Sequence, residues 1–538
     1  MDPPVTTRLS APTCALALAA LITACTGDDS GDDSGTATAT AGSTTSSATD
    51  PTATTSASAS GTASGTATMS GTDSQGETTT STTGPSTTST TADPTTSTTD
   101  PTTTAGPTTA DPTTDTDSTT GDTTMGVTTG PPPPVCGNGV LEEGEECDDG
   151  NLVPNDKCSN ECAKVPCDQQ MGGGGGMFDF SYLWASNSPA GTVSKIDTAG
   201  ATEVARYVSG PPGKQDPSRT SVSGDGRHAV VVNRNGSITM FAAEKEDCID
   251  KNNNGVIDTS NGPGNVLPWG TDECQIWSVD LPGTSNQGPR PVSWNIGPQN
   301  PDTCEYGMGD VWVGWYVQGQ NTGYFRLLNG EDGATITEVS VPSWSGMNWG
   351  PYGGAIDSEN NFWVIGWGQS GPIVKIDGQT YQPTKYNNPG GWIYGMGLDL
   401  KGNTWASGCG NGNVYKFDKM TQTSKLVANV NAGCLRGLQV DSEGRAFIAK
   451  NSPCGLAVID TKTDTVINAN VPIAGCSTPV GVSIDAEGFV WVLDQGASRA
   501  FKVNPDNYQV VGQVTGLQSP YTYSDMTGAG IAAQIAPQ

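Results

Sequence analysis

The chain has 538 residues and a net charge of −31, with 56 Asp and Glu against 25 Lys and Arg. A chain of this length is too long for one ordinary domain. Its shortage of cations argues against nucleic acid and anionic membrane surfaces as partners, because binding to phosphate requires clustered Lys and Arg. We therefore expect an exposed, soluble protein that does not bind nucleic acid.

Residues 1–24 have the features of an export signal. Ala11 to Ala24 form an apolar run that is too short to span a bilayer as a mature helix. The run leads into Ala24-Cys25 within a stretch that resembles the bacterial lipobox. That resemblance implies a lipid anchor on Cys25 and, because no Asp follows this Cys directly, a location at the outer membrane. An ordinary secretory signal with an incidental Cys is the alternative.

A tract rich in Thr, Ser, Ala, Gly and Pro occupies residues 25–135. It repeats Asp-Pro-Thr-Thr at 93–96, 100–103 and 111–114. So few large apolar residues cannot offset the entropy that ordering the tract would cost. We predict a disordered stalk between the anchor and the folded part of the chain; an insertion without function is the alternative.

Residues 136–167 form a short cysteine-rich module. Cys136, Cys147, Cys158 and Cys162 stand in the frames Cys-Gly-Asn-Gly and Cys-Asp-Asp-Gly-Asn, which resemble a short repeat of myxobacterial surface proteins. So small a segment needs covalent staples to fold. The spacing lacks the paired Cys-x-x-Cys of zinc knuckles, so we predict disulfides. A glycine-rich hinge follows at 168–176.

The cysteine count predicts how the bridges are distributed. Apart from Cys14 and Cys25, five cysteines lie in the module and seven lie further along the chain. Both groups are odd in number, so one bridge is expected to join them, with Cys167 and Cys304 as the candidates. Local pairs are predicted for Cys248–Cys274, Cys409–Cys434 and Cys454–Cys476.

The clearest pattern is an internal repeat within residues 177–538. The frame Gly-x-x-x-Asp-x-x-Gly, or a close variant of it, recurs at Asp357, Asp399, Asp441 and Asp485, which lie 42, 42 and 44 residues apart. Six residues after each Asp stands an aromatic residue, in turn Trp363, Trp405, Phe447 and Trp491. Short strands at this period predict an all-β fold, a β-propeller, with the aromatic series packed between blades.

The ends of the repeat region indicate how the ring closes. The segment around Trp184 matches the second strand of later repeats, so the chain enters the propeller in the middle of a blade. Asp525 and Gly528 repeat the Asp-x-x-Gly frame with no second strand behind them. We predict that the two ends share one blade, which hides the sheet edges. The count is seven blades, although the irregular residues 219–342 also fit six or eight.

An insertion at about 243–274 carries one pattern typical of a metal site. Oxygen-bearing side chains fall at positions 1, 3, 5 and 9 of a loop with glycine at position 6, as in the calcium loop of the EF-hand. Position 12 lacks the expected Glu, and Glu244, Asp247, Asp272 or Glu273 would complete the shell. A polar turn is the alternative to structural calcium. The predicted ligands are Asp250, Asn252, Asn254, Val256, Asp258 and Asn261.

The repeats resemble the virginiamycin B lyase-like and gluconolactonase/NHL propellers over residues 177–530. That resemblance implies catalysis through histidines and a metal, but His228 is the single His of this chain. No Ser-His-Asp set is available, so we predict no catalytic residue. We expect a monomeric surface lipoprotein whose propeller binds a protein, peptide or glycan. Loop residues such as Trp344, Trp349, Trp367 and Trp392 would stack on sugars where they are exposed, but we expect half or more of them to be buried. A metal-dependent lyase or lactonase is the alternative.

Overall fold

A computed structural model describes residues 134–148, 150, 152, 158–167, 181–283, 287–301, 303–344 and 349–535. The predicted signal segment, the lipidation residue Cys25 and almost all of the predicted stalk lie outside these ranges. Among the described residues, no helix is both long enough and apolar enough to cross a membrane.

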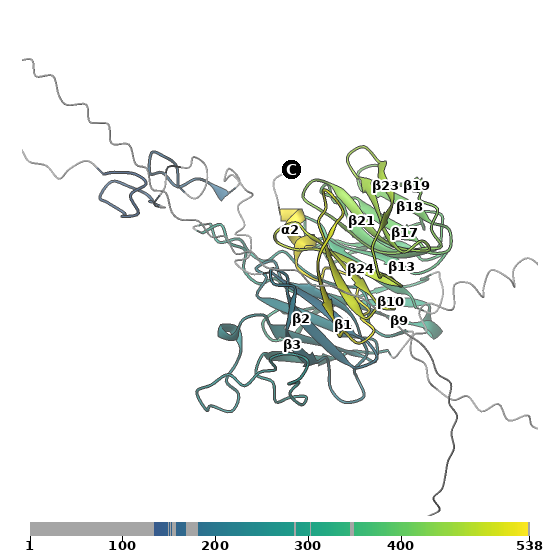
Figure 1. Cartoon of the computed structure of the whole chain (residues 1–538), viewed down its shortest axis with the longest axis horizontal. Helices are drawn as coiled ribbons and strands as arrows, with labels where there is room; N and C mark the ends of the chain where they lie inside the picture. Colours follow the sequence, from purple (N-terminus) through teal and green to yellow (C-terminus); the bar gives the residue numbers. More distant parts are fainter. Residues whose placement is uncertain are drawn as a thin grey trace, which may run out of the picture. The chain divides into compact units, whose positions relative to one another are not determined.

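The described residues from 181 onward form an all-β, seven-bladed propeller, which confirms the predicted fold (Figure 1). Six sheets have four antiparallel strands and one has three. The strands of blades 1 to 3 are β1 Tyr182–Asn187, β2 Thr192–Asp197, β3 Thr202–Val208; β4 Pro217–Val222, β5 His228–Asn233, β6 Ser237–Ala242, β7 Gln275–Asp280; β8 Val292–Trp294, β9 Val311–Val317, β10 Thr322–Leu328 and β11 Thr335–Val341.

Blades 4 to 7 follow the repeat that is visible in the sequence. Their strands are β12 Pro351–Ile356, β13 Phe362–Gly366, β14 Ile373–Ile376, β15 Pro383–Tyr386; β16 Ile393–Leu398, β17 Thr404–Gly408, β18 Asn413–Asp418, β19 Thr423–Asn429; β20 Cys434–Val440, β21 Arg445–Asn451, β22 Gly455–Asp460, β23 Thr465–Pro472; β24 Pro479–Ile484, β25 Val490–Asp494, β26 Arg499–Val503 and β27 Val510–Thr515. The helical elements are the short 3-10 turns η2 Lys245–Asp247 and η4 Gln318–Gln320 and the C-terminal helix α2 Ala529–Ile535.

The two ends of the propeller meet in blade 1, as predicted. In strand β1, Trp184 N donates a hydrogen bond to Met526 O at 3.0 Å, and Ser186 O accepts one from Tyr521 N at 2.8 Å. The segment 520–527 therefore takes the innermost place of that blade, although its few backbone bonds leave it less regular than a ladder strand. Blade 7 then closes on blade 1, since Lys502 Nζ donates to Thr198 O at 2.8 Å.

The spacing between Asp and Trp in the repeat has a direct chemical cause. In blade 5, Asp399 Oδ1 accepts the backbone N–H groups of Lys401 and Asn403 at 3.0 and 2.9 Å, which closes the turn after the innermost strand. Its other oxygen accepts Trp405 Nε1 at 2.9 Å. Blades 4 and 7 repeat this bond at 2.8 and 2.9 Å. A buried carboxylate thus satisfies the turn and the buried indole together.

Blade 6 departs from this pattern and compensates. Its aromatic residue is Phe447, whose side chain has no N–H to donate. Arg445 takes the vacant acceptor instead, with Nε 2.7 Å from Asp441 Oδ2. The buried aspartate therefore keeps a charge-assisted partner although the indole is missing.

The glycine that opens each frame is required by the convergence of innermost strands. A Cβ on Gly395 would lie 2.0 Å from Arg436 O, and one on Gly481 would lie 1.8 Å from Thr522 O. Each of these oxygens belongs to the next blade around the ring. No side chain fits at such distances, so the repeat keeps glycine where neighbouring blades approach most closely.

Six disulfides join the twelve cysteines among the described residues. Those predicted for Cys167–Cys304, Cys248–Cys274, Cys409–Cys434 and Cys454–Cys476 are confirmed. Within the module, Cys136 pairs with Cys162 and Cys147 pairs with Cys158. So many disulfides are typical of exported proteins, which fold in oxidising surroundings.

Candidate functional site

The two ends of the central axis differ in their side chains. We call the end where the innermost strands finish the helix end, because α2 packs there, and the end where they begin the aromatic end. Gln534 of α2 donates from Nε2 to Asp399 O at 2.9 Å, directly after strand β16. Ile531 of α2 lies beside Gly224, just after strand β4. Helix α2 therefore crosses the axis at the helix end.

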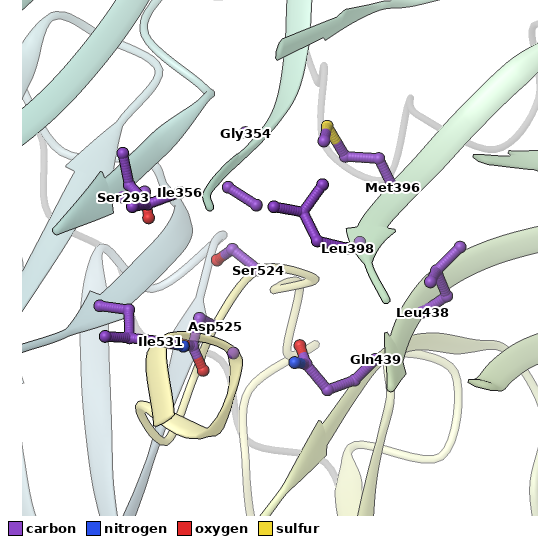
Figure 2. Close-up of a pocket in the computed structure, with 13 residues that line it drawn as sticks. Ser293, Gly354, Ile356, Met396, Leu398, Leu438, Gln439, Ser524, Asp525 and Ile531 are labelled. Carbon is purple, nitrogen blue, oxygen red and sulfur yellow. The ribbon is translucent and has the colours of Figure 1, made fainter. Parts of the chain in front are cut away.

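The helix end is closed. Figure 2 shows residues from several innermost strands, among them Ile356, Leu398 and Leu438, around a space that Asp525 and Ile531 also line. That cavity measures about 30 Å³, which is the order of one water molecule. Burial raises the pKa of Asp525, whose carboxylate accepts the N–H groups of Gly528 and Ile531. The cavity beneath α2 therefore has room for about one water molecule.

The aromatic end gathers cations and aromatic rings. Tyr352 and Tyr394 lie at the starts of β12 and β16, and Tyr521 and Tyr523 come from the C-terminal segment. These four side chains belong to one buried cluster. Three buried arginines, Arg219, Arg290 and Arg436, each lie over one or more rings of this group or of the adjoining Trp349.

Arg219 is almost completely enclosed, with 1% of its surface exposed. Its guanidinium carbon lies 3.4 Å from the ring centroid of Tyr523 and 5.0 Å from that of Tyr352. Such contacts stabilise a desolvated cation by about 2 kcal/mol. Nη1 donates to Ser218 O at 2.7 Å. Nε and Nη2 make no hydrogen bond to any described residue.

Three of the four predicted loop tryptophans gather beside this cluster. Trp349 and Trp367 meet edge to face with centroids 4.3 Å apart, and Trp392 lies 5.3 Å from Trp367. Trp349 and Trp392 remain partly exposed. Trp344 instead packs in the core against Phe325. Partly exposed indoles next to buried tyrosines form a surface on which a flat ring can stack.

Two carboxylates at the aromatic end have partners within the chain. Asp216 pairs with Arg234 at 2.6 Å. Asp494 accepts the backbone N–H groups of Ser477 and Thr478 at 2.7 and 2.8 Å. Neither carboxylate neutralises Arg219 in this structure, since the ion pairs found among the described residues do not include it.

Two disulfides hold the loops of this end at equivalent places. Cys409 follows strand β17 of blade 5 and bonds to Cys434 at the start of the innermost strand of blade 6. Cys454 follows β21 of blade 6 and bonds to Cys476, just before the innermost strand of blade 7. Each bridge ties one blade to the next, which limits the freedom of the loops around the aromatic end.

The predicted calcium loop lies between β6 and β7 and brings four of its six predicted ligands together. Asp258 Oδ2 accepts Asn252 Nδ2 and Asn254 Nδ2 at 2.9 and 3.0 Å. Asp250 accepts Asn254 N and Gly255 N, and Gly255 has a φ of 82°, as the sharp turn requires. These four side chains therefore take part in one hydrogen-bonded turn around Gly255.

The other residues considered for the shell are arranged differently. Asn261 Oδ1 accepts Asn265 Nδ2 at 3.0 Å in a separate turn, and Val256 is exposed. Buried Glu273 instead holds the loop from behind, since its carboxylate accepts Lys251 N and Asp258 N at 2.9 and 2.8 Å. Asp247 pairs with Arg227 at 2.6 Å. The Glu273 side chain thus holds the loop in place by accepting hydrogen bonds from the backbone N–H groups of the loop.

His228 begins strand β5 and therefore lies toward the helix end, away from the tyrosines. Its Nδ1 is 3.9 Å from Asp225 Oδ1, and its ring lies 6.5 Å from that of Trp294 in the next blade. Burial raises the pKa of Asp225, but the neighbouring His228 and hydrogen bonds from Ser223 Oγ and Arg227 N outweigh it and hold that pKa below its usual value. His228 has no second histidine with which to share proton transfer.

Sequence reasoning missed the arginine and tyrosine cluster, although part of its signal is visible. Tyr352, Tyr394, Arg436 and Val480 each stand directly before the first glycine of a frame. That position starts an innermost strand, so its side chains come together around the axis. Arg219 and Tyr523 carry no such signal, because the frames to which they belong are irregular.

Two clusters of metal-ligating residues occur among the described side chains, but neither is available to bind a metal ion. The two groups of three metal-ligating residues that lie close together are Cys454, Cys476 and Asp494, and Glu145, Asp148 and Cys162. Each group contains sulfur atoms that are held in disulfides. Neither therefore offers three free ligands.

Comparisons with known proteins match two parts of the chain. The family described as a domain of unknown function, DUF4215, matches residues 133–163, which are the cysteine-rich module. No curated protein matches the chain.

Solved structures resemble the propeller at low sequence identity. A streptogramin B lyase is 14% identical, covers 58% of this chain and 87% of its own, and has a TM-score of 0.42. The virginiamycin B lyase of Staphylococcus aureus is 13% identical, with 56% and 84% covered and a TM-score of 0.39. Dihydro-heme d1 dehydrogenase NirN is 11% identical, with a TM-score of 0.40; the match covers 63% of this chain and 64% of that one. The seven blades are established by strand order and not by these scores.

Proposed function

We propose that this protein is an exported, surface-anchored lipoprotein whose propeller binds a ligand at the aromatic end without catalysis. The observation that carries the proposal is the gathering of partly exposed tryptophans over a buried cluster of tyrosines and arginines. Aromatic and arginine side chains of this kind dominate binding surfaces, because they offer large rigid contact area and directed hydrogen bonds. The closed helix end leaves the aromatic end as the approach to the axis.

Binding is favoured over a lyase or lactonase by the chemistry of the nearby groups. His228 lies toward the opposite end, and Asp216 and Asp494 are engaged by Arg234 and by backbone N–H groups. Arginine is a poor general base because it stays protonated in proteins. The side chains that converge at the aromatic end therefore suit recognition better than proton transfer.

The test is a binding screen with matched tryptophan variants. The full mature chain is immobilised and exposed to panels of peptides and glycans. Trp392→Ala, at the aromatic end, should weaken capture of any ligand found at least tenfold. Trp269→Ala is the control, because Trp269 is also partly exposed but lies in the β6–β7 insertion. Equal effects of both variants, or turnover of a panel member by the wild type, would contradict the proposal.

We also propose that the β6–β7 insertion holds a structural calcium ion through Asp250, Asn252, Asn254 and Asp258. Support comes from the convergence of these side chains and from the Cys248–Cys274 bridge at the two ends of the insertion. Calcium takes six to eight oxygen ligands, so the Val256 carbonyl and water would complete the shell. Two carboxylates among the ligands suit the modest affinity of extracellular calcium modules.

The anchor is proposed on Cys25, which lies outside the described residues. Support comes from its sequence context and from the export that six disulfides indicate. Cys25→Ser should release the folded protein from membranes while its melting temperature stays unchanged. Mass spectrometry that finds a mature N-terminus other than a lipidated Cys25 would refute the anchor.

A further inference from the structure

Arg219 carries a permanent charge in surroundings that do not neutralise it. The side chain is 1% exposed, and its guanidinium remains protonated in proteins. Removing such an ion from water costs several kcal/mol unless hydrogen bonds and an opposite charge offset the loss. Ser218 O satisfies Nη1, while Nε and Nη2 have no partner among the described residues.

The unsatisfied edge of Arg219 is the edge that binds carboxylates. Arg206 of the same chain shows the geometry, since its Nε and Nη2 donate to the two oxygens of Glu203 at 2.7 and 2.8 Å. Paired N–H groups on that edge match the two oxygens of a planar carboxylate. Arg219 presents the same pair of donors without a carboxylate opposite them.

The surroundings of Arg219 add positive charge and flat rings. Tyr352 contacts Arg219 and also lies 5.6 Å from Arg290, while Arg436 lies 5.5 Å from Tyr394 in the same tyrosine cluster. Two further cations near Arg219 make an incoming anion more favourable than a neutral group. The excess of positive charge is local, since the chain as a whole has a net charge of −31.

The rings that cover Arg219 belong partly to the least regular innermost segment. Tyr521 and Tyr523 lie in residues 520–527, which bond to β1 through Tyr521 N, Met526 O and Thr522 Oγ1 rather than through a full ladder. Side chains at binding surfaces commonly change rotamer when a ligand arrives. Rotation of Tyr523 would uncover the guanidinium, whose ring partners belong to the same cluster as Trp349, Trp367 and Trp392.

We infer that Arg219 binds a carboxylate on a ring-bearing ligand, whose ring stacks on the tryptophans of the aromatic end. This inference rests on the proposed binding function and names the chemical group that is recognised. The carboxylate would form two parallel hydrogen bonds with Nε and Nη2 and would neutralise the buried charge. A ligand without the carboxylate would leave that charge unpaired.

The experiment measures binding of small acids to the full chain by calorimetry in calcium-containing buffer. Benzoate and glucuronate are the probes, so that an aromatic ring and a sugar ring are distinguished. Benzamide and glucose are their uncharged partners, and inorganic phosphate is the tetrahedral anion. We expect at least one acid to bind tenfold or more tightly than its uncharged partner and than phosphate. Equal binding of acids and uncharged partners, or of phosphate, would overturn the inference.

Variants assign the effect to Arg219. Arg219→Met should reduce binding of the preferred acid at least tenfold without lowering the melting temperature, because an unpaired buried charge is removed. Arg219→Lys keeps the charge but loses the paired N–H donors of the guanidinium, so its affinity for the preferred acid should fall at least fivefold. This variant also tests the inference if the Met variant does not fold. Arg326→Met is the control, since Arg326 pairs with Glu338 on an outer strand.

Two results would separate this inference from the function on which it rests. Wild-type affinity for the acid in both Arg219 variants would overturn the inference. If ligands from the peptide and glycan screen depend on Trp392 but not on Arg219, the binding function stands and the carboxylate assignment fails. If acids bind through Arg219 while the screen shows turnover, the non-catalytic function fails and the carboxylate site stands.

Discussion

The helix end and the aromatic end of the propeller are built by opposite rules. At the helix end, buried charges find partners inside the chain; Asp485, for example, accepts Trp491 Nε1 at 2.9 Å and faces Lys502 Nζ at 3.4 Å. At the aromatic end, Arg219 is buried with two of its donors unused. Proteins usually satisfy buried polar groups, and exceptions concentrate where function requires them. Under the proposed binding function, this contrast is expected of a ring in which one end maintains the fold and the other receives the ligand.

The repeated aspartates at the helix end are buried and have hydrogen-bond donors within the chain. Burial raises the pKa of Asp485, although Trp491, Lys502 and the N–H of Phe489 all favour its charged form. Such a carboxylate is tolerated only because each of its oxygens has donors. The same amount of burial around Arg219 has no matching acceptor for Nε and Nη2, which is why the two ends should respond differently to substitution.

Deleting residues 520–538 should have the largest effect, because it removes the closing segment from both ends. Tyr521, Tyr523, Met526 and Ile531 are all buried, and burying each large side chain stabilises by roughly 1.5–3 kcal/mol. We expect a loss above about 5 kcal/mol, seen as a lower midpoint of one cooperative urea transition.

A shorter deletion of residues 529–538 separates the two ends. It removes α2 but keeps Tyr521 and Tyr523, so it should cost less and leave ligand binding at the aromatic end intact. If the longer deletion melts like the intact chain, strand sharing does not close the ring. If the shorter deletion abolishes binding, the two ends are not independent.

Asp399→Ala should cost about 3 kcal/mol, because it leaves several buried donors unsatisfied, among them Trp405 Nε1 and Asn403 N. Asp418→Ala in the same blade is the control; its carboxylate caps an exposed turn through Met420 N and Thr421 N, so about 1 kcal/mol is expected. Equilibrium unfolding in guanidinium chloride measures both losses of stability. Similar losses would show that the Asp–Trp pair adds nothing beyond its turn.

Calcium removal should lower stability by about 2 kcal/mol, since an ion that binds only the folded state stabilises it by mass action. Differential scanning calorimetry with and without a chelator provides the measurement. Asp250→Ala should melt at the same temperature in both conditions. Acid binding through Arg219 should persist after chelation, because the insertion does not belong to the aromatic end. If the chelator leaves the melting temperature of the wild type unchanged, the loop does not bind calcium.

His228→Ala should have the smallest effect, about 1 kcal/mol of stability through lost packing against Trp294. Ligand binding should be unchanged, because the residue lies toward the helix end. If an activity exists and this substitution reduces its rate roughly 100-fold at unchanged melting temperature, His228 is a general base. That outcome would replace the binding function with a lyase-like one.

Much of the fold could be predicted because its signals are local. The six-residue spacing from Asp357 to Trp363 and from Asp399 to Trp405 reflects a turn and an indole hydrogen bond that are made within one blade. The bridges Cys409–Cys434 and Cys454–Cys476 are also local, since they join cysteines that lie 25 and 22 residues apart. Irregular frames weakened the prediction for residues 219–342, where Ser223 stands in place of the aspartate and accepts His228 N.

The sequence by itself predicted the repeat, the shared blade and four disulfide pairs, and it located the loop for which we propose calcium. Only the tertiary structure decided that Arg219 and Tyr523, 304 residues apart in sequence, lie face to face. Closing the ring brings the starts of the innermost strands together, whatever their separation along the chain. Charge and aromatic chemistry at that point are therefore a property of the assembled blades, and the spacing of residues within any one repeat does not reveal them.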